Sequence, residues 1–199
     1  MSDFPNPVGR VAEPIARTVS ILVGWAILAF SVALTVEIVG RKLFGLSFKG
    51  MDELGGFVLA ITAAVGASYA MAMRGHTRVD VFLVRLPRPV QRVLNTLALI
   101  SLAGFAGFAA WRGWAVIDET LEFSSSAPNL GIPLWVPQSV WLTGLVLFAA
   151  IAIAYALHAL FLLSTGRPGI DALYGPLSVE EELHSELEAL EARHQEEHR

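Results

Sequence analysis

Four long apolar runs, separated by short polar connections, make up most of the chain. They cover about residues 18–39, 54–73, 93–111 and 139–163. Each run is close to the roughly 20 residues that a helix needs to cross the hydrocarbon core of a bilayer. Lipid offers no partners to backbone N–H and C=O groups, so such runs are expected to be helical whatever their glycine and alanine content. The pattern predicts an all-α integral membrane protein with a four-helix membrane domain.

The segments outside these runs are polar. An N-terminal segment covers residues 1–17, the membrane domain residues 18–163, and an acidic tail residues 164–199. The first run is too long for a cleaved signal peptide, follows a polar stretch and precedes no A-x-A-like cleavage site, so we expect it to be retained.

Composition supports a membrane protein. Of the residues, 54% are hydrophobic and only 16% are charged, against about 25% charged in an ordinary soluble domain. The chain has no cysteine, which excludes disulfides, thiolate metal sites and a catalytic thiol.

Basic residues are distributed unevenly between the two sides. Four spans place both termini on one side, whose arginines are Arg10, Arg17, Arg74, Arg78, Arg85, Arg88, Arg92 and Arg167. The basic residues of the other side are Arg41, Lys42, Lys49 and Arg112. By the positive-inside rule, the termini and the middle connection are expected in the cytoplasm. Tryptophans near the third connection predict the outer membrane interface: Trp111, Trp114, Trp135 and Trp141.

The middle connection begins with "MRGHTRVD" and continues with an amphipathic pattern. Val79, Phe82, Leu83 and Leu86 follow helical spacing, with arginines at other positions. This predicts a short interfacial helix over about 77–86, lying on the inner leaflet. Because these arginines are needed for topology, no nucleic-acid partner is expected.

The tail "SVEEELHSELEALEARHQEEHR" predicts a helix over about 179–195. Leu183, Leu187 and Leu190 form a narrow stripe on a glutamate-rich helix. An anionic leaflet would repel this acidic face, so the tail is expected to extend into the cytosol. A solvated tail and a partner-binding segment both remain open.

Glu37 is the only acid inside an apolar run. Arg41 follows four residues later, which predicts an ion pair on one helix. A coupling-ion site would instead require several oxygen ligands near the midplane and broken helices. No run has that pattern, so the chain is not expected to transport a solute alone.

Two histidines allow an alternative function. His76 and His158 lie at similar predicted depth and could ligate a haem inside a four-helix bundle. A histidine at a helix end is more often an interface residue, so no cofactor is expected. A haem-bearing or non-catalytic anchor subunit of another complex stays as the alternative. No nucleophile–base pair, phosphate loop or metal-ligand spacing occurs, which argues against an enzyme and against catalytic or metal sites.

Small residues recur every four positions in the second run: Gly56, Ala60, Ala64, Ser68 and Ala72. Such stripes let helix backbones approach closely, either within one protein or between two. Asp52 and Glu53 open this helix, where acids complement the positive end of the helix dipole. The third connection, stiffened by Pro133 and Pro137, is a candidate surface for a periplasmic partner.

The order of these motifs resembles a known family. "GRKLFG" ends the first helix, an acidic pair opens the second, "GASYAMAMRGHTRVDVFLVRLP" closes it, and "LGIPLWVPQSVW" precedes the fourth. This is similar to the small membrane subunit, the Q component, of tripartite ATP-independent periplasmic (TRAP) transporters, over roughly residues 18–163. The most specific pieces are Gly75, His76, Val79 and Asp80, with Gly131 to Trp135. The family's tryptophan before a glutamate pair is absent, since this chain has "GMDE" there.

The resemblance implies a sodium-driven secondary transporter in the bacterial inner membrane. A periplasmic binding protein would deliver an organic acid, a large membrane subunit would move it, and this chain would form a heterodimer with the large subunit as a scaffold embedded in lipid. The candidate residues for contact with that partner or with lipid are Arg41, Asp52, Glu53, Gly56, Ala60, Ala64, Ser68, Arg74, His76, Arg78, Asp80 and Trp135.

Overall fold

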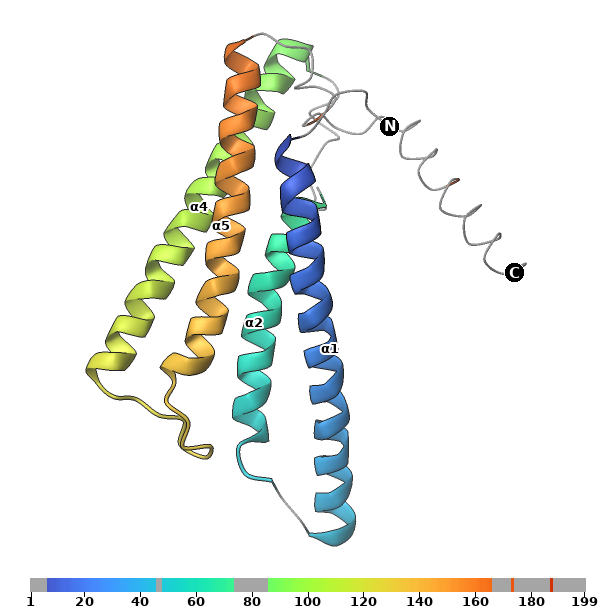
Figure 1. The fold of residues 1–199 in the computed structure, drawn as a ribbon, viewed down its shortest axis with the longest axis vertical. Helices are drawn as coiled ribbons and strands as arrows, with labels where there is room; N and C mark the ends of the chain where they lie inside the picture. The colour runs from blue at the N-terminus through green and yellow to red at the C-terminus, as the bar shows by residue number, and fades with distance from the viewer. Residues whose placement is uncertain (1–6, 46–47, 74–85, 166–172, 174–186, 188–199) are drawn as a thin grey trace.

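The computed structural model describes residues 7–45, 48–73, 86–165, 173 and 187, and most of these are helical. The helices are α1 (Pro7–Phe44), α2 (Met51–Ala72), α4 (Arg88–Glu122) and α5 (Trp135–Ser164). All four are long and apolar enough to cross a membrane. The expected four-helix membrane frame is therefore confirmed (Figure 1).

Two of the helices are much longer than the apolar runs that predicted them. α1 has 38 residues and α4 has 35, so α1 extends about 57 Å at 1.5 Å per residue. The hydrocarbon core is only about 30 Å thick, so both helices continue into water. At the start of α4, prolines at the N-cap and in the first turn remove N–H groups that would lack helical partners in any case.

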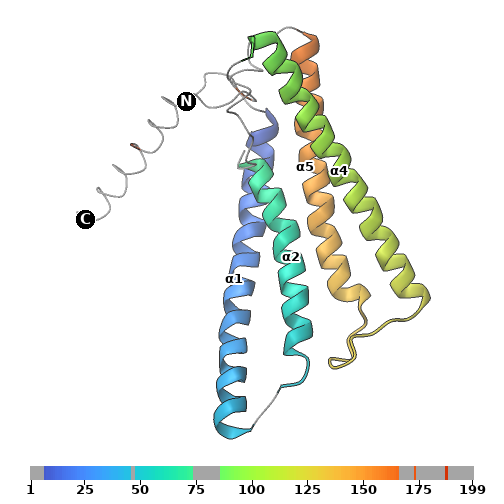
Figure 2. The same cartoon turned by 180° about the vertical axis from the view of Figure 1, so that it is seen from behind.

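The helices form a layer. Along it the order is α1, α2, α5, α4, because α2 packs against α1 and α5, and α4 packs against α5. Figures 1 and 2 show α1 and α4 at opposite edges of this layer. We call the end with the start of α1 and the end of α5 the terminal end, and the end with the α1–α2 and α4–α5 connections the loop end.

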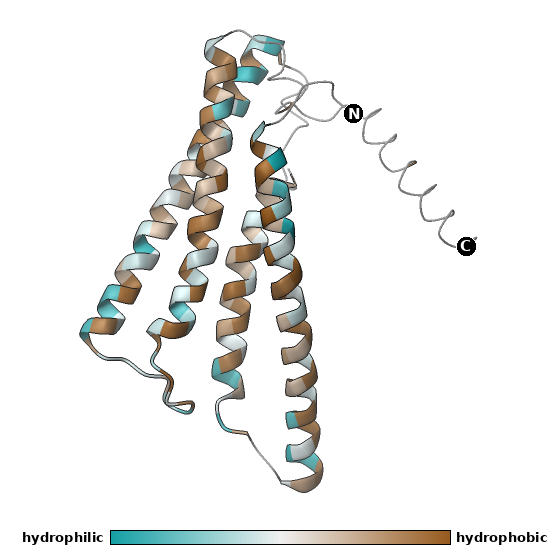
Figure 3. Cartoon of the chain, viewed as in Figure 1, coloured by the Kyte–Doolittle hydropathy of each residue, from teal (hydrophilic) through white to brown (hydrophobic). Residues whose placement is uncertain are grey.

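Exposure follows position in the layer. None of the residues in the most apolar stretch of α1 is buried, whereas 44% of those in α5 are. In Figure 3 brown, apolar residues run along the middle of α1 and α5. On α1 the apolar Leu22, Trp25 and Leu28 are exposed. A membrane protein needs no polar covering on such faces, since lipid solvates them.

The main core lies toward the terminal end and is built largely from small residues. Ala16, Ala152 and Ala159 are fully buried, and the larger Phe148 and Tyr155 fill the space between helices. The hydroxyl of Tyr155 donates to the backbone oxygen of Ala72 across 3.4 Å, which joins α5 to the end of α2. The alanines permit close approach of the helix backbones, on which packing in lipid depends.

Candidate functional site

Within the described ranges, the loop end holds a set of polar contacts between segments far apart in the chain. α2 begins after Gly50, whose φ of 93° is left-handed and disfavours any residue with a Cβ. Asp52 and Glu53 lie in the first turn of α2, as the sequence predicts for acids at a helix start. Asp52 is exposed, whereas Glu53 is partly covered by the α4–α5 connection.

Glu53 binds this connection 76 residues further along the chain. The backbone N–H of Asn129 donates to Glu53 Oε1 at 3.0 Å, and the side-chain amide of Asn129 donates to the same oxygen at 2.8 Å. The N–H of Leu130 donates to Oε2 at 3.1 Å. Hydrogen bonds to a charged acceptor are stronger than neutral ones. We call this set of contacts the Glu53 clamp.

The clamped connection also has a defined internal shape. Ala127 N–H donates to Ile132 O at 2.9 Å, and Gly131 N–H donates back to Ala127 O at 2.8 Å. Gly131 has a left-handed φ of 66°, which glycine adopts without strain. Leu134 N–H closes the turn by donating to Ser125 O at 3.0 Å. The side chain of Ala127 is buried inside it.

Leu130 packs directly over Gly50. A Cβ on Gly50 would lie 2.6 Å from both Cγ and Cδ2 of Leu130. Glycine is thus needed at this position for two reasons: its backbone angle is left-handed, and Leu130 occupies the space that a Cβ would fill. Glu53 and Gly50 together seat the α4–α5 connection on the start of α2.

The sequence offered no signal for the Glu53 clamp. At the level of sequence, the helix dipole alone explains the acidic pair, since it accounts for Asp52 as well as for Glu53. The distance along the chain between Glu53 and Asn129 hides the pairing, since no periodicity links them. The left-handed glycines beside each partner, Gly50 and Gly131, are the local features that mark both turns.

The small-residue stripe of α2 divides into two parts. Ala64 and Ser68 are buried against α5, where a Cβ on Gly144 would lie 3.0 Å from Ala64 Cβ. Gly56 and Ala60, nearer the loop end, are exposed. Ala72 is also buried, so three of the five stripe residues serve internal packing and two are open to lipid or to a partner.

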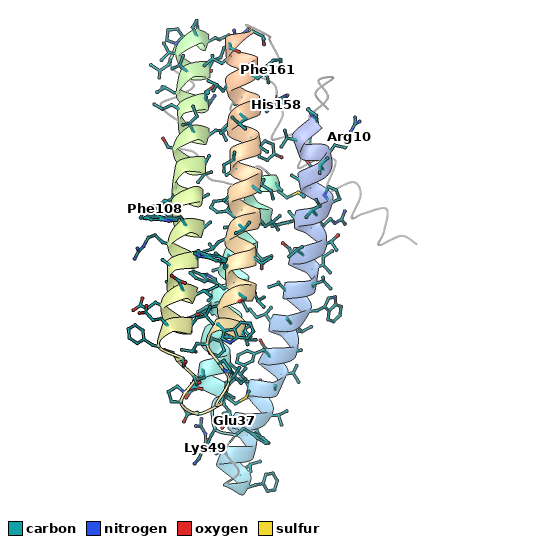
Figure 4. The ribbon with its side chains drawn as sticks, turned by 60° about the vertical axis from the view of Figure 1, so that its left-hand side comes forward. Arg10, Glu37, Lys49, Phe108, His158 and Phe161 are labelled. Carbon is teal, nitrogen blue, oxygen red and sulfur yellow. The ribbon has the colours of Figure 1, made fainter. Side chains whose placement is uncertain are left out.

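The expected ion pair on α1 is confirmed. Arg41 Nε lies 3.7 Å from Glu37 Oε1, and Glu37 is buried while Arg41 is mostly exposed. Figure 4 shows Glu37 and Lys49 at the same end of the molecule. Phe30, nearly two turns before Glu37, packs on Gly55 of α2, so α1 and α2 are in contact close to the pair.

Aromatic residues mark the loop end of α4 and the start of α5. Trp111 and Trp114 are exposed on α4, and the guanidinium of Arg112 lies 5.9 Å from the Trp111 ring centroid. Phe108 packs near the same ring (Figure 4). Trp135 is the first residue of α5 and is 44% exposed. Such residues anchor helices at a membrane–water interface.

Several sequence-based predictions fall on residues that the structure does not describe. They are the interfacial helix over 77–86 apart from Leu86, the tail helix over 179–195 apart from Leu187, and the candidate residues Arg74, His76, Arg78 and Asp80. His158 is half-buried on α5 (Figure 4). Among the described residues, no group of three or more His, Asp or Glu side chains could hold a metal ion.

Comparison with known proteins gives one family. The model described as "Tripartite ATP-independent periplasmic transporters, DctQ component" matches residues 30–162. This range begins within α1 and ends within α5, so it includes the loop end and the Glu53 clamp. No curated protein matches the sequence.

Proposed function

We propose that this chain, which belongs to the DctQ family of tripartite ATP-independent periplasmic (TRAP) transporter components, is the static scaffold of its transporter. The large membrane subunit would form a heterodimer with it in the bacterial inner membrane. That partner would move an organic acid, driven by a sodium gradient, after a periplasmic binding protein delivers it. The termini would face the cytoplasm and the loop end the periplasm, as the arginine distribution predicts.

The strongest support for a scaffold role is that α2 contacts two other parts of the chain. Toward the terminal end it packs against α5 through Ala64 and Ser68, and at its start Glu53 binds the α4–α5 connection. Alternating access requires one part to stay fixed while another moves. Because α2 is held to α5 and to the α4–α5 connection, the layer of helices suits the part of the transporter that stays fixed.

The acid in the first span also favours a scaffold. Glu37 lies close to Arg41 near the loop end of α1 instead of facing other carboxylates at mid-depth. Among the described residues, no three His, Asp or Glu side chains come together as they would at a carboxylate-rich ion site. Sodium coupling and substrate movement are therefore assigned to the large subunit.

Co-purification tests this function directly. The chain, co-expressed with its cognate large subunit and extracted in mild detergent, should elute with that subunit as one stable species. A large subunit from an unrelated TRAP system serves as the control and should elute separately. Separate elution of the cognate pair would contradict the proposed role.

A further inference from the structure

We infer that Glu53 is a positioning residue for substrate delivery: by clamping Asn129 and Leu130 it holds the α4–α5 connection in the shape that the loaded binding protein meets. This rests on the proposed function, which supplies the binding protein and places the loop end in the periplasm. Glu53 does not touch substrate in this scheme. It acts through the connection.

The connection is more ordered than a link between two helices requires. The N–H groups of Ala127, Gly131 and Leu134 donate internal hydrogen bonds that shape its turn. The Glu53 clamp adds three N–H donors from a different part of the chain. Ordering backbone and side chains costs free energy, so an additional tether indicates that the position of the connection relative to α2 matters.

The surface of the connection suits a protein partner. Phe123 is 70% exposed, and Ile132 is 37% exposed within the turn that the clamp fixes. Pro133, which follows, is exposed and stiff. Exposed apolar side chains on a pre-formed turn can be buried by a partner without a large ordering cost. If the Glu53 clamp were lost, the turn would have to be ordered on binding, and this cost would weaken docking of the binding protein.

A carboxylate suits this geometry because both of its oxygens accept. Oε1 accepts from the backbone N–H and the side-chain amide of Asn129, and Oε2 accepts from the N–H of Leu130. In Glu53→Gln, one oxygen becomes an NH₂ group, which would face an N–H donor. The side chain keeps its size and loses part of the clamp. Glu13→Gln makes the same change at an exposed glutamate of α1 at the terminal end, away from the connection, and serves as the matched control.

A substitution at Gly50 also displaces the connection, and it does so without a change in charge. Gly50→Ala places a Cβ 2.6 Å from Leu130, so Leu130 must move. The left-handed φ of 93° adds strain to that variant. Asn129→Ala is milder, because it removes only the side-chain amide bond to Glu53.

The test measures uptake by liposomes that contain both membrane subunits, as a function of the concentration of substrate-loaded binding protein. Glu53→Gln and Gly50→Ala should raise the concentration for half-maximal uptake about tenfold and change the maximal rate less than twofold. Glu13→Gln should match the unmodified protein. Equal half-maximal concentrations for Glu53→Gln and Glu13→Gln, or a decrease confined to the maximal rate, would overturn the inference.

Folding is checked by co-purification of each variant with the large subunit. If Glu53→Gln and Gly50→Ala do not assemble, Asn129→Ala decides: a rise of about threefold in the half-maximal concentration supports the inference, and no rise overturns it. Failure of the unmodified components to pair or to take up substrate would instead contradict the proposed function.

Discussion

Ser68 of α2 lies against Gly144 of α5, with the hydroxyl oxygen of Ser68 3.2 Å from the carbonyl oxygen of Gly144. The same hydroxyl is 3.2 Å from the carbonyl oxygen of Ala64, one turn back on its own helix. Such proximity requires small residues on both sides, because a Cβ on Gly144 would lie 3.3 Å from the backbone nitrogen of Val65. This contact fixes the middle of the layer.

Ala64→Phe should destabilise the protein through overpacking at that contact. Forcing a large side chain into a close-packed site costs about 1–3 kcal/mol or more. The melting temperature in detergent should fall by about 5 °C or more. The adjacent Ala63 is exposed, so Ala63→Phe is the matched control and should melt like the unmodified protein. Equal melting temperatures for the two variants would show that this contact does not stabilise the protein.

Gly56→Leu combined with Ala60→Leu should weaken pairing with the large subunit and leave folding intact. Both residues are exposed, and a Cβ at Gly56 meets no atom within 4 Å. We expect the yield of co-purified large subunit to fall severalfold, because close helix approach in lipid needs small residues. Gly66→Leu, on a different face of α2, is the control. An unchanged yield for the double variant would assign this face to lipid.

Tyr155→Phe should lower the unfolding free energy only slightly, and Tyr155→Ala should lower it strongly. The hydroxyl bond to Ala72 is long at 3.4 Å, so its loss is expected to lower the unfolding free energy by about 0.5 kcal/mol, the weak end of the usual range. Removing the buried ring should cost about 3–5 kcal/mol. Thermal melts of the two variants check this ranking, and similar melting temperatures would contradict it.

Arg41→Ala should destabilise the protein by less than about 1 kcal/mol, since the side chain of Arg41 is 59% exposed and solvent screens its interaction with Glu37. Lys42→Ala removes a neighbouring exposed cation and should have no measurable effect. The difference between the two variants should shrink at high salt. A decrease in the unfolding free energy above about 2 kcal/mol would show that Arg41 does more than pair with Glu37.

The four helices could be predicted from sequence because length and hydropathy alone specify a membrane span. The Glu37–Arg41 pair followed from helical spacing. The order of helices in the layer could not be predicted, because the most apolar stretches of α1 and α5 have few charged residues to mark one face. A face toward lipid then looks the same as a face toward protein. The extension of α4 to Glu122 was missed because its last turns, with Asp118 and Glu119, lie beyond the apolar run.

The Glu53 clamp was missed for a different reason. Its partners, Asn129 and Leu130, lie in a connection whose sequence indicates only a turn, and contacts between distant loops leave no periodic pattern. The membrane orientation, the interfacial helix over 77–86 and the tail helix over 179–195 stay predictions. They depend on charge and amphipathic patterns in segments largely outside the described part of the chain.

The central claim is that this chain is a fixed scaffold with no solute pathway of its own. Uptake of labelled organic acid by liposomes under an inward sodium gradient, in the presence of loaded binding protein, tests it most directly. Liposomes with this chain alone should accumulate no more label than empty liposomes, and addition of the large subunit should start uptake. Accumulation by the chain alone would contradict the account.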